Sequence, residues 1–190
     1  MEQTIIHNRN KIHPQKFALW ASLASILMMF GAFTSAYIVK QSAGNWLEFS
    51  LPASFYFSTA LLVLSSITLH ISQRSFVRQQ ISKYKIFLGV SFLLGILFVV
   101  LQYAGWTELY DKGVDLKGNV SGSFFYLLSG IHALHVLGGL AALMVAVIHA
   151  FSLGNHVTPA RKHRFDLVVT YWHFVDALWV YLFVFLIISK

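Results

Sequence analysis

Apolar residues in this chain gather in five long blocks that are separated by short polar segments. The blocks cover about residues 17–39, 52–71, 86–104, 124–151 and 167–188. A helix needs about 20 apolar residues to cross the roughly 30 Å hydrocarbon core of a bilayer, because each residue adds about 1.5 Å. All five blocks are close to that length or exceed it. The pattern therefore predicts an all-α fold: a bundle of five transmembrane helices that form a single membrane domain over residues 1–190.

The composition agrees with this prediction and removes several classes of function. Of the 190 residues, 57% are hydrophobic and 11% are charged, whereas soluble domains carry about 25% charged residues. The chain has no cysteine, which excludes disulfides, thiol catalysis, cysteine-ligated zinc and cysteine-ligated iron–sulfur clusters. Phosphate-loop, dinucleotide-binding and serine-nucleophile motifs are also missing. The connecting segments are too short for a soluble catalytic domain, so we expect no catalytic centre outside the bundle.

The basic residues indicate how the bundle is oriented. Ten of the fourteen Lys and Arg residues fall in the segments 9–16, 74–85 and 161–164, which the five spans place on one side of the membrane. The other four are Lys40, Lys112, Lys117 and Lys190, on the side that also carries Glu48, Glu108, Asp111 and Asp115. The positive-inside rule then predicts a cytoplasmic N-terminus and a C-terminus outside. The net charge of +7 is thus a topology signal, and we expect no nucleic-acid partner.

The last span contains polar residues in an unusually aromatic setting. Residues 171–183 read YWHFVDALWVYLF. An aspartate in hydrocarbon costs ~2.5–3.5 kcal/mol on insertion scales, so Asp176 should face protein. His173 lies three residues earlier on the same helical face, and Trp172 and Trp179 flank Asp176. A structural lock between helices, a proton relay and a ligand site are all compatible with this stripe. We favour the lock, because no chain of further carboxylates follows Asp176.

Histidines in the fourth span raise the question of metal or haem ligation. His132 and His135 share a helical face, but haem ligation needs two histidines at matching depth on different helices. The spans place His173 several residues deeper than this pair. His70 and His149 could match in depth near the basic side. We favour hydrogen bonding between helices for these histidines and predict no metal or cofactor site in this chain.

Small residues recur at every fourth position of the fourth span. Gly138, Ala142 and Ala146 form such a stripe, and small-xxx-small patterns let a second helix approach closely in a bilayer. The sequence therefore predicts a helix-packing groove on this face.

Two runs identify a family. FFYLLSGIHALHVLGG (124–139) and YWHFVDALWVYLF (171–183) resemble the signatures of subunit III of the haem–copper respiratory oxidases, and the remaining spans are similar to that family in order. Five spans match its short bacterial form. The residues on which the resemblance rests are His132, His135, Trp172, His173, Asp176 and Trp179.

The resemblance implies an accessory, non-redox role in an aa3-type terminal oxidase of a bacterial plasma membrane. In such a complex haem and copper belong to partner subunits. Subunit III contacts subunit I, assembles with subunit II and other respiratory subunits, holds phospholipid and supports proton uptake. The polar residues of the last span would then hold the bundle together.

One residue departs from the family pattern, and two other functions remain open. Many members carry a glutamate in a stretch like LASEVMFFGA, where this chain has LASILMMFGA with Ile26. A role that depends on that glutamate is therefore in doubt here. The alternatives are a haem-b membrane anchor of a quinone-linked oxidoreductase and a subunit III relative associated with nitric oxide reductase. Whether cytochrome c or quinol supplies the electrons is not encoded in this chain.

Overall fold

The chain folds into long, nearly antiparallel helices. The computed structural model describes residues 13–44, 46–152 and 158–189. Within these residues lie five helices and no strand: α1 (Pro14–Gln41), α2 (Ala53–Val77), α3 (Ile81–Asp111), α4 (Val120–Ser152) and α5 (Pro159–Ile188). Each of the five is long and apolar enough to cross a membrane. The predicted all-α fold of membrane-spanning helices is confirmed.

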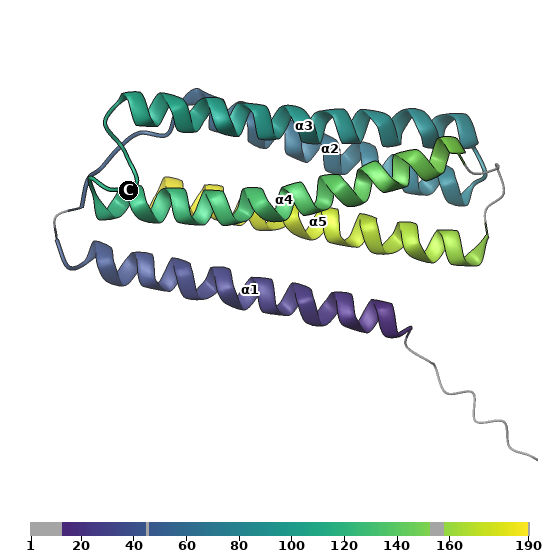
Figure 1. Cartoon of the computed structure of the whole chain (residues 1–190), viewed down its shortest axis with the longest axis horizontal. Helices are drawn as coiled ribbons and strands as arrows, with labels where there is room; N and C mark the ends of the chain where they lie inside the picture. Colours follow the sequence, from purple (N-terminus) through teal and green to yellow (C-terminus); the bar gives the residue numbers. More distant parts are fainter. Residues whose placement is uncertain (1–12, 45, 153–157, 190) are drawn as a thin grey trace, which may run out of the picture.

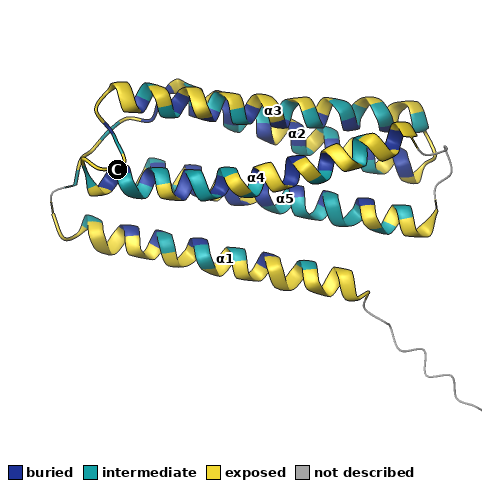
Figure 2. Ribbon diagram, viewed as in Figure 1, coloured by how far each residue is buried: buried dark blue, intermediate teal, exposed yellow. Residues whose placement is uncertain are grey.

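The helices stack in three layers, which Figure 1 shows from the side. Helices α2 and α3 form one layer, α4 and α5 form the middle layer, and α1 lies alone on the far side of the middle layer. In the described residues α1 packs against α4 and α5 but not against α2 or α3. Figure 2 shows the consequence, since α1 is largely exposed while most residues of α5 are intermediate or buried.

The helices extend beyond the apolar blocks of the sequence. Helix α2 continues to Val77 and α3 begins at Ile81, and α5 begins at Pro159, eight residues before its apolar block. These extensions meet in a ring cluster, because Phe76 lies 4.7 Å from Tyr84 and 5.5 Å from Phe165 between ring centroids. Aromatic packing of this kind stabilises helix past the hydrocarbon.

Local signals account for the helix ends. Pro14 and Pro159 occupy the first turns of α1 and α5, where the missing N–H has no helical partner in any case. The Thr158 hydroxyl caps α5 by accepting a hydrogen bond from the Arg161 N–H at 3.3 Å. Pro52 precedes α2 as its N-cap, one position before the first helical residue. Gly113, at φ 80°, ends α3 in the left-handed conformation that favours glycine.

Basic residues of three segments lie at one end of the bundle, which we call the basic end. Because successive helices alternate in direction, the start of α1, the α2–α3 turn and the start of α5 come together there (Figure 1). Arg9 and Lys11, part of the α4–α5 connection (153–157), and Lys190 lie outside the described residues. The orientation of the basic end toward the cytoplasm remains a prediction.

Candidate functional site

The stripe of polar residues on α5 faces α2. The Trp172 indole N–H donates a hydrogen bond to the Ser65 hydroxyl at 3.2 Å, and the Trp179 indole N–H donates to the Thr59 hydroxyl at 3.0 Å. Between them, His173 Nδ1 lies 2.5 Å from the hydroxyl oxygen of Ser66. We call this contact the polar seam; it comprises Thr59, Ser65 and Ser66 of α2 and Trp172, His173, Asp176 and Trp179 of α5.

Asp176 lies within the polar seam but is not bonded by it. Its side chain is only 5% exposed, and the Ser66 hydroxyl is near enough to interact with the carboxylate. Nevertheless, neither carboxylate oxygen accepts a hydrogen bond of normal geometry from the described residues, since Ser66 is engaged with His173. Buried polar atoms are nearly always paired in native proteins. Asp176 is therefore the one side chain of the polar seam that has no hydrogen bond among the described residues.

Trp172 is held in place by two glycines on other helices. A Cβ added to Gly139 of α4 would lie 2.9 Å from Trp172 Cε3, and one added to Gly95 of α3 would lie 2.8 Å from Trp172 Cη2. Both distances are too short for a methyl group. The indole ring thus fills a space that exists because both positions lack a side chain, and α3, α4 and α5 approach closely at this level.

His132 and His135 of α4 lie apart from the polar seam's hydroxyl groups. The His132 ring is 1% exposed and stacks on Trp179 with centroids 4.9 Å apart, and neither ring nitrogen has a hydrogen-bond partner among the described residues. His135 Nδ1 lies 2.8 Å from the carbonyl oxygen of Ile131 in the same helix. The backbone carbonyl of His135 accepts a hydrogen bond from Tyr171 Oη at 3.1 Å. A side chain of α5 is thus hydrogen-bonded to the backbone of α4 at this point.

The remaining histidines have different surroundings. His70 lies beside His173, with ring centroids 6.2 Å apart, whereas His149 lines a cavity at the basic end. The sequence allowed a His70–His149 pair, but the structure gives His70 a neighbour on α5 instead. Among the described residues, no group of three or more His, Asp or Glu side chains is arranged to hold a metal ion.

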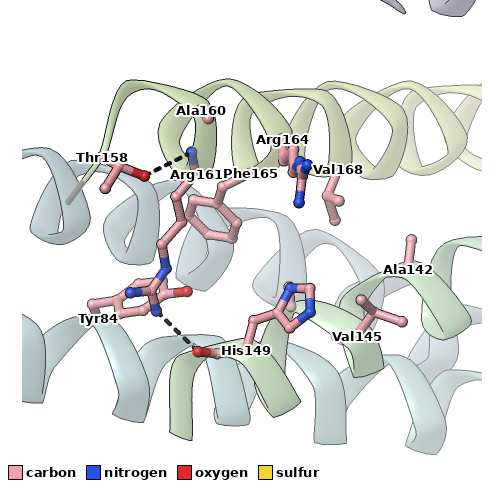
Figure 3. Close-up of a pocket in the computed structure, with 11 residues that line it drawn as sticks. Tyr84, Ala142, Val145, His149, Thr158, Ala160, Arg161, Arg164, Phe165 and Val168 are labelled. Carbon is pink, nitrogen blue, oxygen red and sulfur yellow. Dashed lines mark hydrogen bonds between the residues drawn. The ribbon is translucent and has the colours of Figure 1, made fainter. Parts of the chain in front are cut away.

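The small residues of α4 border that cavity. Gly138 faces α5, where an added Cβ would lie 3.6 Å from the Tyr171 hydroxyl. Ala142 and Ala146 line the cavity, which has a volume of about 450 Å³ between α4 and α5. Figure 3 shows the Arg164 side chain of α5 and the His149 side chain of α4 extending into the space between the two helices. The Arg161 guanidinium lies nearby and donates to the His149 carbonyl at 3.0 Å.

Sequence reasoning missed the serines of α2. Ser58, Ser65 and Ser72 are fully buried at seven-residue spacing, and each contacts α3. Ser58 accepts from the Gln102 amide at 2.9 Å, while Ser65 and Ser72 donate to backbone carbonyls of α3 at 3.0 Å. The signal was present, because hydroxyl residues repeating every seven positions on a transmembrane helix mark a face that packs on protein.

Known proteins resemble this chain over nearly its whole length. The family model described as cytochrome c oxidase subunit III matches residues 48–189. A probable cytochrome c oxidase subunit 3 of Mycobacterium bovis is 30% identical over 183 residues, which cover 94% of this chain and 89% of the relative. A probable cytochrome c oxidase subunit 3 of Nocardia farcinica is 30% identical over 188 residues, with the same coverage. The cytochrome c oxidase subunit 3 of Corynebacterium diphtheriae is 29% identical over 170 residues, covering 85% and 82%. The chain therefore belongs to the subunit III family of the haem–copper oxidases.

Proposed function

We propose that this chain is the accessory, non-redox subunit III of an aa3-type terminal oxidase in a bacterial plasma membrane. Membership of the family implies a complex with other oxidase subunits. The observation that carries the accessory role is the polar seam, in which Trp172, His173 and Trp179 are engaged in contacts between helices. Side chains used in this way hold a bundle together, and electron transfer to oxygen is left to subunits I and II.

Copurification tests this assignment. Membranes are solubilised in mild detergent, the chain is isolated through an affinity tag, and its companions are identified by mass spectrometry. We expect subunits I and II of an oxidase in equal stoichiometry with this chain. Recovery with the subunits of a nitric oxide reductase instead would contradict the proposal.

We further propose that the chain itself carries no haem, copper or iron. His132 is enclosed by Trp179 and Phe98 and has no free approach for a metal. One of the two ring nitrogens of His173 is already engaged with the Ser66 hydroxyl. After separation from subunit I, the chain should show no haem absorption band and no stoichiometric metal by elemental analysis. One haem or copper per chain would favour a haem-bearing anchor and overturn this part of the proposal.

The cavity at the basic end supports a role in lipid binding. Its lining includes the basic side chains of Arg161, Arg164 and His149 and a group of apolar side chains: Ala142, Val145, Ala146 and Val168. A lining that combines cationic and apolar side chains is suited to an anionic phospholipid, because the phosphate gains charge-assisted hydrogen bonds while an acyl chain covers the apolar side chains. Lipid held here would brace α4 against α5.

Lipid retention by a variant tests this site. Arg164→Gln removes one of the two arginine charges in the cavity lining and should lower the amount of anionic phospholipid that stays bound through detergent washing. The matched control is Arg74→Gln on α2, also exposed at the basic end but not part of the cavity. Equal lipid loss from both variants would show that the cavity is not the binding site.

We propose that support of proton uptake by the oxidase is indirect. Asp176 is enclosed within the bundle, so it is suited to holding structure and not to collecting protons from the medium. An oxidase depleted of this chain should take up protons more slowly and inactivate during turnover. Unchanged proton uptake and lifetime after depletion would contradict this role.

A further inference from the structure

A strip of polar side chains runs along α2 and α5 from the basic end toward the middle of the bundle. On each helix three polar residues follow one another at four- and three-residue spacing, so they share one face. We call these residues the polar strip: Ser66, His70 and Gln73 of α2, and Asp166, Thr170 and His173 of α5. His70 is exposed and the others are partly exposed, so the strip lies at the surface of the bundle.

Contacts at the two ends of the polar strip fix how the two helices pair. The Gln73 amide donates to Asp166 Oδ1 at 2.8 Å at the basic end, and Ser66 Oγ lies 2.5 Å from His173 Nδ1 at the inner end. Because α2 and α5 run in opposite directions, the middle residue of each set of three lies between these pairs. The rings of His70 and His173 have centroids 6.2 Å apart. Polar groups therefore follow one another turn by turn along the strip.

The polar strip extends deep into the membrane span. Asp166 and His173 are seven residues apart, which corresponds to about 10 Å along a helix axis. His173 lies fourteen residues after the first residue of α5 and fifteen before the last. Ionisable side chains at such depth are rare on lipid-facing surfaces and normally face protein or a water-filled space. A strip that carries two imidazoles and a carboxylate is therefore unsuited to acyl chains.

Beyond its inner end the polar strip gives way to an apolar surface. The exposed residues that continue the two faces are apolar, since Val63 of α2 is 42% exposed and Val180 of α5 is 37% exposed. Further on, the rings of Tyr56 and Phe183 pack edge to face with centroids 5.1 Å apart. Asp176 lies in the buried interior and is not part of the strip. The polar surface is thus continuous with the basic end alone.

Water entering from the basic end would complete the hydrogen bonding of the polar strip. The Thr170 hydroxyl donates to the Asp166 carbonyl at 2.8 Å, and one ring nitrogen of His173 is engaged with Ser66. The hydroxyl lone pairs, the second ring nitrogen of His173 and the exposed His70 ring are left to bond with water. Imidazole binds and releases protons near neutral pH, so water at these rings also brings protons.

We propose that the polar strip is a half-channel, through which water and protons reach His173 from the basic end and go no further. A proton from water binds to the ring of His70 or His173 and returns to water on the same side, so no net transport occurs. The strip supplies no proton to another subunit, in agreement with the indirect role proposed above. The inference goes beyond that role and does not depend on which complex contains the chain.

Thiol labelling tests the half-channel, because natural cysteines are absent. Ser66→Cys places a thiol at the inner end of the polar strip. The matched control is Ile67→Cys, at the same depth but on a face away from the strip, where Ile67 is 52% exposed. A small cationic methanethiosulfonate is added to membranes that contain the complete complex, on the side of the basic end. The reactive thiolate forms in water and not in hydrocarbon, so Ser66→Cys should be labelled at least about tenfold faster than Ile67→Cys.

The direction of labelling is part of the test. Labelling of Ser66→Cys no faster than that of Ile67→Cys would overturn the inference and show that lipid or protein covers the polar strip. Equal labelling of Ser66→Cys from both sides of the membrane would overturn it too, because a half-channel opens to one side. Thr170→Cys is a second reporter, on α5, that leaves the contact between Ser66 and His173 in place. It should show the same one-sided labelling.

Interruption of the polar strip provides a second measurement. In the Ser66→Cys background, His70→Leu replaces the exposed imidazole with an apolar side chain and should slow labelling about tenfold, because water no longer reaches the thiol. His70→Asn keeps hydrogen-bonding groups at this position and should leave the labelling rate nearly unchanged. Equal rates in the two variants would mean that the reagent does not travel along the strip.

Deuterium exchange at the histidine rings tests access of protons to the inner end. The hydrogen on the carbon between the two ring nitrogens exchanges slowly with solvent deuterium, and mass spectrometry measures the exchange in the intact complex. His173 should exchange. His132 is 1% exposed and enclosed by aromatic rings, so it is the internal control and should not exchange. Protection of His173 equal to that of His132 would contradict the half-channel.

Discussion

Trp172 contacts three other helices through one indole ring. Its N–H donates to Ser65 on α2, and its ring lies where side chains on Gly95 of α3 and Gly139 of α4 would otherwise stand. A large ring enclosed on several sides cannot shift to admit even a methyl group without disturbing its neighbours. The glycines next to Trp172 are thus as specific to the packing as the tryptophan itself.

Alanine at adjacent glycines should therefore have opposite effects. Gly139→Ala places a methyl group 2.9 Å from the Trp172 ring and should destabilise the bundle by about 1–3 kcal/mol through overpacking. Gly138→Ala is the control, because its methyl group would meet the Tyr171 hydroxyl at an ordinary 3.6 Å and alanine is the better helix former. Unfolding in mixed detergent micelles measures both. Equal stability of the two variants would show that the ring can move.

Two variants of Asp176 distinguish a structural role from a role in proton transfer. Asp176→Asn keeps hydrogen-bonding capacity without charge, so assembly and oxygen consumption should change little. Asp176→Leu removes the carboxyl group that lies near the Ser66 hydroxyl. The loss of a buried polar partner costs about 1–3 kcal/mol and should loosen the chain from the oxidase in detergent. Oxygen consumption, proton uptake and subunit stoichiometry are measured for both variants. An intact complex whose turnover is impaired by asparagine would favour the proton relay.

At the scale of helices, α2 serves as the common partner of α3 and α5. Ser58, Ser65 and Ser72 bond to α3, and Thr59, Ser65 and Ser66 bond to α5. Hydrogen bonds between helices in membranes contribute modestly, about 0.6 kcal/mol on average. Several together give α2 a defined rotation between its two neighbours.

A double-mutant cycle measures one of these bonds. Thr59→Val removes the hydroxyl that accepts from the Trp179 N–H, and Trp179→Phe removes the donor. If the bond contributes as such bonds do on average, the coupling energy should be about 0.6 kcal/mol. The control pair is Thr59→Val with Trp106→Phe, since the Trp106 N–H donates elsewhere, to Ser129. Equal coupling in both pairs would mean that the bond contributes nothing specific.

The helices were predictable from the sequence, but their ends were not. An apolar block of about 20 residues is enough to identify a span, and all five identified blocks lie within or directly at the observed helices. The block ends where hydrocarbon ends, whereas α5 begins eight residues earlier, where Phe165 packs on Phe76 and Tyr84. Contacts of that kind join distant segments and leave no periodic signal in the sequence.

Only the α5 side of the polar seam was predictable from the sequence. Spacing placed His173 and Asp176 on one face and required that face to meet protein. It did not identify α2 as the partner, because Ser66 is one of several serines on that helix. Likewise, the small residues of α4 suggested close helix packing, yet Ala142 and Ala146 line a cavity. Small side chains permit close approach, but the neighbouring helices decide whether it occurs.

At the scale of the whole molecule, the basic end predicts an orientation. Because natural cysteines are absent, single cysteines can report it. Ser82 lies exposed at the basic end and Ser42 lies exposed at the opposite end, so Ser82→Cys and Ser42→Cys form a matched pair. The positive-inside rule predicts that a membrane-impermeant thiol reagent added outside labels the Ser42→Cys variant and spares the Ser82→Cys variant until the membrane is opened. Labelling of both variants from outside would contradict the topology.

The attachment of α1 has a consequence for how the chain is made. Tyr37 Oη and the Gln41 amide both donate to the carbonyl of Ser189, at 2.9 and 3.2 Å, and the Thr34 hydroxyl bonds to Tyr181 at 3.0 Å. Tyr37 and Ser189 are 152 residues apart. A ribosome that adds about 5–20 residues per second therefore takes roughly 8–30 s between making Tyr37 and making Ser189. Helix α1 is made before the other four helices but can complete its docking on α5 only after residue 189 has emerged, and until then the translocation machinery or lipid must accommodate it.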